Sequence, residues 1–255
     1  MDEYLTSSVI HWYEDLEDRL LEFLRFFPFV DPNTGVSSPR LAGIITETCN
    51  ILDSLLREAS EPLSTIGSKR IKRDELDITH FAALYAKNLH LPSTKSVVFV
   101  SPPRYIIPFE CWKQLAAGGQ YVPATWWTAY TKLKHNRIGD IGQATLRTAV
   151  ESMCGLHQVI ARLPDLMRAT LRHEWLQASG YNPEWLIEEL TANRKTDQMH
   201  LVEVSFSRSP LVEAINSLMT SLNSGRRATS VASVWLASSV GCNPCPRWKP
   251  SGAPF

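Results

Sequence analysis

The sequence lacks both a net charge and a long apolar run. Lys and Arg together number 26, and Asp and Glu together also number 26, among 255 residues. No bulk charge therefore draws the chain to nucleic acid or to an anionic membrane. No run of about 18 apolar residues occurs, so the sequence predicts no membrane-spanning helix. The first residues, MDEYLTSS, are acidic where a secretory signal is basic. We expect a cytoplasmic protein that meets charged partners only through a local patch.

Cysteine is scarce, and its spacing offers little metal chemistry. Cys49, Cys111 and Cys154 are isolated, which is typical of buried thiols in a reducing compartment. Cys242 and Cys245 form a single CxxC, whereas a structural zinc site needs four ligands. A metal or redox role for this pair is the alternative to a chance spacing. The motifs GxGxxG, GxxxxGK(S/T), HExxH and GxSxG are absent. We expect no metal and no small-molecule cofactor.

What the sequence does have is helical periodicity with clear end signals. Apolar residues recur three and four apart over 4–27 and 40–60, with charged residues between them. Ser38 followed by Pro39 is typical of a helix start, and Asp77 is a candidate cap for a helix that runs to residue 90. Further helices are predicted to open at 126 and to cover 141–163, 166–179 and 182–194.

Strand patterns are few and short. Residues 96–100 (SVVFV) predict an extended segment and 201–207 a strand, whereas 209–224 predicts a helix. Residues 61–73 predict a connection that carries a basic cluster, and the composition of the last thirty residues indicates disorder.

The predicted fold class is mainly α. We expect an up-and-down bundle of five to seven helices over 1–198, a short appended strand and helix over 199–224, and a disordered tail over 225–255.

The stretch WWTAYTKLKHNR, residues 126–137, concentrates aromatic and cationic side chains. A helix turns by about 100° per residue. Five of these side chains therefore share one face if the helix reaches residue 137: Trp126, Trp127, Tyr130, Lys134 and Arg137. His135 lies on the opposite side. Such a face would suit stacking of a single-stranded base beside Lys134. The alternative is a core whose Lys and Arg extend their charged ends to solvent.

A polar row interrupts the apolar pattern of the predicted helix over 40–60. Its members are three or four residues apart and lie on one side of the helix: Glu47, Asn50, Asp53 and Arg57. If this helix packs against the one that opens at 126, we expect Glu47 and Asp53 to meet Lys134 and Arg137, and Tyr130 to supply a hydroxyl. The row is either a structural ion-pair network that fixes helix register or part of a binding site.

The order of these motifs resembles that of helical bacterial proteins of the HEPN superfamily. The resemblance covers about residues 38–163 and rests on Glu47-x-x-Asn50-x-x-Asp53-x-x-x-Arg57, Pro108-Phe109-x-x-Trp112, Trp127-x-x-Tyr130 and Lys134-His135-x-Arg137. It implies a helical bundle, often dimeric. It also implies a setting in anti-phage defence, toxin–antitoxin pairs or RNA handling.

Many proteins of that superfamily are metal-independent endoribonucleases, so the resemblance also implies a candidate catalytic pair. Their signature is an Arg followed by a His after four to six residues, where the His acts on the ribose 2′-hydroxyl and the Arg holds the scissile phosphate. Three pairs in this chain have that spacing: Arg73/His80, Arg168/His173 and Arg194/His200. Arg168 and His173 lie inside a predicted helix and are the candidate pair, although Ala169 stands where the family usually has a polar residue. The alternative for His173 is a surface or capping role.

Three functional hypotheses follow. The first is a HEPN-like protein-interaction or RNA-associated module, in a bacterial defence or toxin–antitoxin setting. The second is a metal-independent endoribonuclease that uses Arg168 and His173. The third is a structural subunit of a larger complex. The expected partners are a second copy of the chain, another protein or RNA, and not a membrane.

Overall fold

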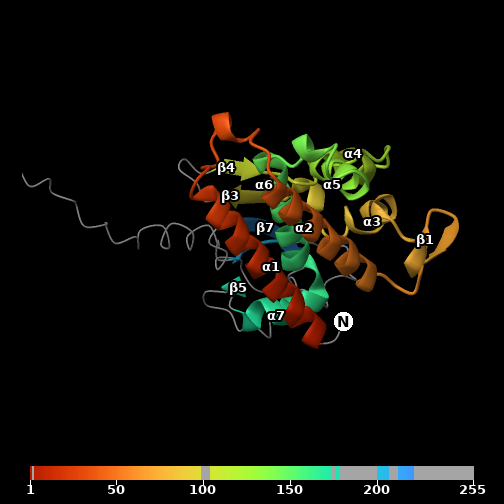
Figure 1. Ribbon diagram of the computed structural model, residues 1–255. Coiled ribbons are helices and arrows are strands. Elements are labelled where there is room, and N and C mark those ends of the chain that lie inside the picture. The colour runs from red at the N-terminus through yellow and green to blue at the C-terminus, as the bar shows by residue number, and fades with distance from the viewer. Residues whose placement is uncertain (2, 99–103, 174–175, 178–199, 207–211, 221–255) are drawn as a thin grey trace, which may run out of the picture.

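A computed structural model describes residues 1, 3–98, 104–173, 176–177, 200–206 and 212–220 of the chain (Figure 1). This part of the chain is mainly helical, as predicted. Its α-helices are α1 (Glu3–Leu24), α2 (Pro39–Glu58), α3 (Ile78–Tyr85), α4 (Lys113–Ala116), α5 (Thr125–His135), α6 (Leu146–Arg162) and α7 (Pro164–Arg172). The helix predicted over 182–194, the tail over 225–255, and the Cys242/Cys245 pair lie outside the described residues.

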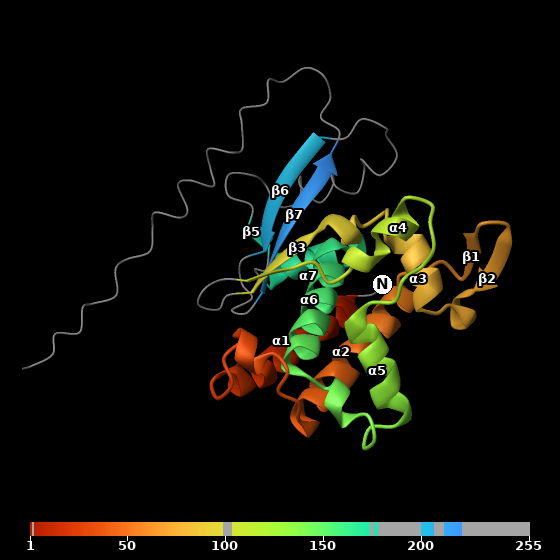
Figure 2. The same ribbon diagram turned by 90° about the horizontal axis from the view of Figure 1, so that it is seen from above.

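Helices α1, α2, α5 and α6 form the bundle (Figure 2). Ion pairs show that α1 and α2 run antiparallel, because Arg19 pairs with Glu47 and the earlier Arg40 pairs with the later Glu22. Helix α2 also packs against α5 and α6, so it lies at the centre of the bundle. None of the described helices combines the length and the hydropathy needed to cross a bilayer.

The core of the bundle follows the apolar periodicity of the sequence. On α1 and α2 fully buried apolar side chains recur mostly three or four apart, among them Ile10, Tyr13, Leu16, Leu20, Leu41, Ile44, Ile45, Cys49, Leu52 and Leu56. Each such side chain stabilises the folded state by about 1.5–3 kcal/mol relative to leaving it in water.

Two predicted helix starts are confirmed. The Ser38 hydroxyl accepts a hydrogen bond from the amide of Leu41, and Pro39 is the first residue of α2. The Asp77 carboxylate accepts hydrogen bonds from the Thr79 and His80 amides, while the His80 ring accepts one from the Asp77 amide, which completes a capping box. The helix after Asp77 ends at Tyr85 and not at residue 90.

The segment over 61–73 is a β-hairpin, although the sequence predicts only a connection. Strands β1 (Leu63–Ile66) and β2 (Lys69–Lys72) pair antiparallel. Gly67 lies in the turn with φ of 60°, a left-handed conformation that glycine adopts without a steric penalty. The hairpin projects from one side of the helices (Figure 2).

A second sheet contains the strands β3 (Lys95–Val98), β4 (Arg104–Ile106), β5 (Leu176–Gln177), β6 (His200–Phe206) and β7 (Val212–Thr220). Their order is β4-β3-β7-β6-β5, and all neighbours are antiparallel. The extended segment predicted near 96–100 is confirmed as β3, and β6 lies over the strand predicted at 201–207. The helix predicted over 209–224 is wrong, because β7 pairs with β3 on one side and β6 on the other. This pairing overrides a weak local helical pattern.

The last two helices differ from prediction at their ends. Residues 141–143 form a 3-10 turn, so the helix predicted over 141–163 begins only at Leu146. The helix predicted over 166–179 begins at Pro164, since proline fits the first turn of a helix, and it ends at Arg172. Arg168 therefore lies in α7, and His173 directly follows its last residue, with its amide donating to the carbonyl oxygen of Ala169.

Candidate functional site

The aromatic residues of α5 belong to the core of the protein. Trp126, Trp127 and Tyr130 are only 1%, 8% and 5% exposed. The indole N–H of Trp126 donates a buried hydrogen bond of 2.9 Å to the carbonyl oxygen of Pro108. These rings offer no open face on which a base could stack. Of the two interpretations of this stretch, the packed core is therefore the one that the structure supports.

Pro108-Phe109-x-x-Trp112 is part of the same packing. The Phe109 ring lies 4.6 Å from that of Trp112 and 5.5 Å from that of Trp126, the latter edge-on. Helix α6 makes room for Trp126 at Gly155, where an added Cβ would lie 3.1 Å from the indole ring. The motif thus has a structural role, because it forms an aromatic cluster between α5 and α6.

Helices α2 and α5, whose contact the sequence leaves open, do pack together, but not through an ion-pair network. The Tyr130 hydroxyl donates a 2.6 Å hydrogen bond to Asn50, and burial raises the pKa of Tyr130 to about 12. Helix α5 ends at His135, so Arg137 lies beyond it and donates to the Thr46 hydroxyl at 3.2 Å.

The exposed end of α5 carries Lys134 and His135. Lys134 is exposed, and its ammonium lies 5.7 Å from the centre of the Tyr130 ring. His135 is also exposed and closes the helix. Neither residue meets a carboxylate of the polar row.

The charged residues of that row have partners outside α5. Glu47 accepts from Arg19 of α1 at 2.7 Å, and Asp53 accepts from Arg57 at 3.2 Å. Arg57 also donates to the carbonyl oxygens of Arg73 and Asp74, both at 3.0 Å. The predicted pairs of Glu47 and Asp53 with Lys134 and Arg137 are therefore wrong. Arg19 and Arg57 hold these carboxylates instead, which gives the row a structural role.

Arg73, His80 and His173, three residues of the candidate Arg/His pairs, have contacts in the described structure. Arg73 pairs with Glu58 at 3.2 Å, and His80 completes the Asp77 capping box, so both are part of the local structure. His173 packs against α1, where its ring centre lies 4.8 Å from that of His11. Arg194 lies outside the described residues. A catalytic role for Arg168 and His173 stays a prediction.

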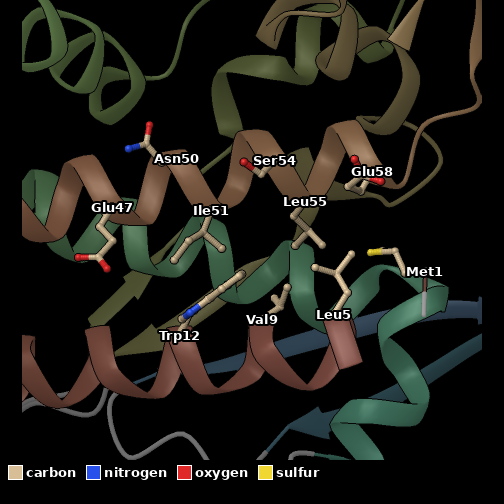
Figure 3. Close-up of a pocket in the computed structure, with 10 residues that line it drawn as sticks. All are labelled: Met1, Leu5, Val9, Trp12, Glu47, Asn50, Ile51, Ser54, Leu55 and Glu58. Carbon is tan, nitrogen blue, oxygen red and sulfur yellow. The ribbon is translucent and has the colours of Figure 1, made fainter. Parts of the chain in front are cut away.

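A groove between α1 and α2 is a site that the sequence did not indicate (Figure 3). Its volume is about 310 Å³, and its lining residues are Met1, Leu5, Val9, Trp12, Glu47, Asn50, Ile51, Ser54, Leu55 and Glu58. The apolar side chains of α1 and α2 point toward one another across it, whereas Asn50 points away (Figure 3). The periodicity of α1 places Trp12 with the core residues, yet its ring is 49% exposed.

The two helices that form this groove are acidic. Helices α1 and α2 together carry nine carboxylates, of which only Glu17 is buried, and three arginines: Arg19, Arg40 and Arg57. Because the whole chain has no net charge, this imbalance is a local property of these two helices.

A second feature that the sequence did not indicate joins α1 to the end of α7. His11, Glu14 and His173 each offer one metal-ligand atom, and these atoms lie within 4.8 Å of one another. The spacing His11-x-x-Glu14 on a helix was the available signal, but His173 is distant in the sequence, so only the fold brings the three together.

Comparison with family models, curated proteins and solved structures finds no match to this chain. The HEPN resemblance therefore stays a prediction.

Proposed function

We propose that this chain is a protein-interaction module. Its partner is an amphipathic helix that places apolar side chains in the α1–α2 groove and carries Lys or Arg on its flanks. The main support for this proposal is the largely apolar groove between α1 and α2, which the half-exposed Trp12 lines. A groove of this kind matches the helix-in-groove mode of recognition, in which apolar residues one helical turn apart insert between two helices.

We expect binding to centre on the exposed tryptophan of the groove. Trp12 leaves 49% of its surface in water beside the apolar side chains of Val9 and Ile51. Tryptophan is among the residues that contribute most at protein interfaces, because a large, rigid ring buries much apolar area at a low cost in conformational entropy. A partner that covers Trp12 and the groove would bury this apolar surface.

Charge defines the rest of the partner. Glu47 and Glu58, which pair with Arg19 and Arg73, lie at the edge of the groove, and α1 as a whole carries six carboxylates and one arginine. A basic helix is attracted to this face at long range, which raises the association rate more than the final affinity. The same charge repels a phosphate backbone, so it argues against RNA on this face. It also argues against a second copy that presents the same acidic face across a two-fold axis.

The test uses fluorescein-labelled designed peptides of about 18 residues, roughly five helical turns. One peptide has Leu at i, i+3, i+4 and i+7 with Lys elsewhere, and its matched control has Glu in place of Lys. Fluorescence anisotropy measures their binding to the full chain. We expect the Leu/Lys peptide to bind and the Leu/Glu peptide not to bind.

The variant Trp12→Ala then locates the site. We expect it to weaken binding of the Leu/Lys peptide by at least about tenfold, equivalent to about 1.4 kcal/mol. The matched control is Tyr105→Ala, which removes an exposed aromatic side chain on β4, outside the groove. Equal binding of both peptides, or equal loss in both variants, would contradict the proposal.

A further inference from the structure

We propose that His11, Glu14 and His173 form a binding site for one divalent transition-metal ion of the zinc class. The three side chains come from α1 and from the residue that follows α7. The site does not include the apolar lining of the groove, so this proposal and the proposed function can fail independently.

The first two ligands are already close to metal-binding geometry. His11 and Glu14 lie three residues apart on α1 and therefore on one face of the helix. The Nδ1 atom of His11 is 3.3 Å from a carboxylate oxygen of Glu14. Zinc binds nitrogen and oxygen at about 2.0–2.2 Å, which places two tetrahedral ligands about 3.4 Å apart. A zinc ion between these two atoms would need little movement of either side chain.

His173 provides the third ligand from another part of the chain. Its ring centre is 4.8 Å from that of His11, and the ring planes differ by 80°, so the two imidazoles are not stacked face to face. The position of His173 is supported by an ion pair between Arg172 and Glu3, which ties the end of α7 to α1. All three ligand atoms lie within 4.8 Å, a spread that side-chain rotation can close.

The donor atoms decide the kind of metal. Two imidazole nitrogens and one carboxylate oxygen suit zinc and the neighbouring transition metals, whereas magnesium and calcium prefer an all-oxygen shell. Three protein ligands leave a fourth tetrahedral position for water. The His11 side chain is 66% exposed, so solvent reaches this position.

The test is a zinc titration of the full chain against a chromophoric chelator. The CxxC at Cys242 and Cys245 is a second set of possible zinc ligands, so the titration is also made in a Cys242→Ser/Cys245→Ser background. In that background we expect one zinc ion per chain. His11→Ala, Glu14→Gln and His173→Ala should each weaken zinc binding by at least about tenfold, the lower end of the effect of changing even an outer-shell residue.

His135→Ala is the matched control, because it removes an exposed histidine at the end of α5 and should leave the zinc affinity unchanged. Circular dichroism checks that each variant is folded, which we expect because the side chains of His11, Glu14, His173 and His135 are not fully buried. Absence of saturable zinc binding in the cysteine-free background would overturn the proposal. So would zinc binding that depends on His11 and Glu14 but not on His173, since the site would then lack its third ligand.

Discussion

Replacing Trp126 by phenylalanine tests whether the aromatic stretch of α5 is core. The side chain is 1% exposed, and its N–H donates to the Pro108 carbonyl in a buried environment. Leaving that carbonyl oxygen without a donor costs about 1–3 kcal/mol. Phenyl is also smaller than indole by roughly two carbons, at about 0.8 kcal/mol for each buried group. Together these give a loss of about 3 kcal/mol in the free energy of unfolding.

Urea unfolding followed by far-ultraviolet circular dichroism measures that loss. The matched variant is Trp12→Phe, which makes the same chemical change in a side chain that is 49% exposed, and we expect it to cost less than about 1 kcal/mol. If Trp126→Phe lowers the free energy of unfolding no more than Trp12→Phe does, the expectation is contradicted. In that case the aromatic residues of α5 would contribute little to stability, and a binding role for them would have to be considered again.

Three further predictions concern capping, acid sensitivity and RNA. Hydrogen bonds from Thr79 and His80 outweigh partial burial and lower the pKa of Asp77, so Asp77→Ala should cost about 1 kcal/mol at neutral pH. In urea unfolding this difference should shrink as the pH falls below the ordinary value of 3.8. Burial lowers the pKa of His157 from 6.5 to about 3, so the unfolded chain binds the proton first and stability is lost as the pH falls through this range. His157→Leu should flatten the dependence of the urea midpoint on pH between about 3 and 6.5. An unchanged pH dependence would contradict this role of His157. For a protein-binding module we expect no cleavage of a labelled mixed-sequence RNA in EDTA. Cleavage that is lost in His173→Ala but kept in His135→Ala would instead support the endoribonuclease hypothesis.

Local signals in the sequence were sufficient for much of the helical fold. The Ser38-Pro39 start of α2 and the Asp77 cap of α3 depend on side-chain chemistry within three residues, which the sequence contains in full. The packing of α2 against α5 could not be predicted, because an apolar face does not identify the helix that covers it. Nor could the partners of their charged residues, because Arg19 reaches Glu47 from α1 and competes with any cation on α5.

Features that depend on distant segments were missed. The local sequence of β7 has a helical pattern, but the segment is a strand because it pairs with β3 and β6. The exposure of Trp12 depends on what covers the groove between α1 and α2, which periodicity does not record. Similarly, His11 and His173 meet only because α7 returns to α1. Sequence patterns predict which face of a helix is apolar, but not which of its residues remain uncovered.

The central position of β7 has a consequence for the order in which the chain can fold. About 120 residues separate Lys95 of β3 from Ile215, its partner in β7. At a synthesis rate of about 5–20 residues per second, β3 waits roughly 6–24 s on the ribosome before that partner exists. Until then one edge of β3 has only unpaired backbone groups, which are a template for pairing with another chain. The helical bundle can form earlier because its last helix, α6, ends at Arg162, whereas the sheet also needs β7 and is completed last.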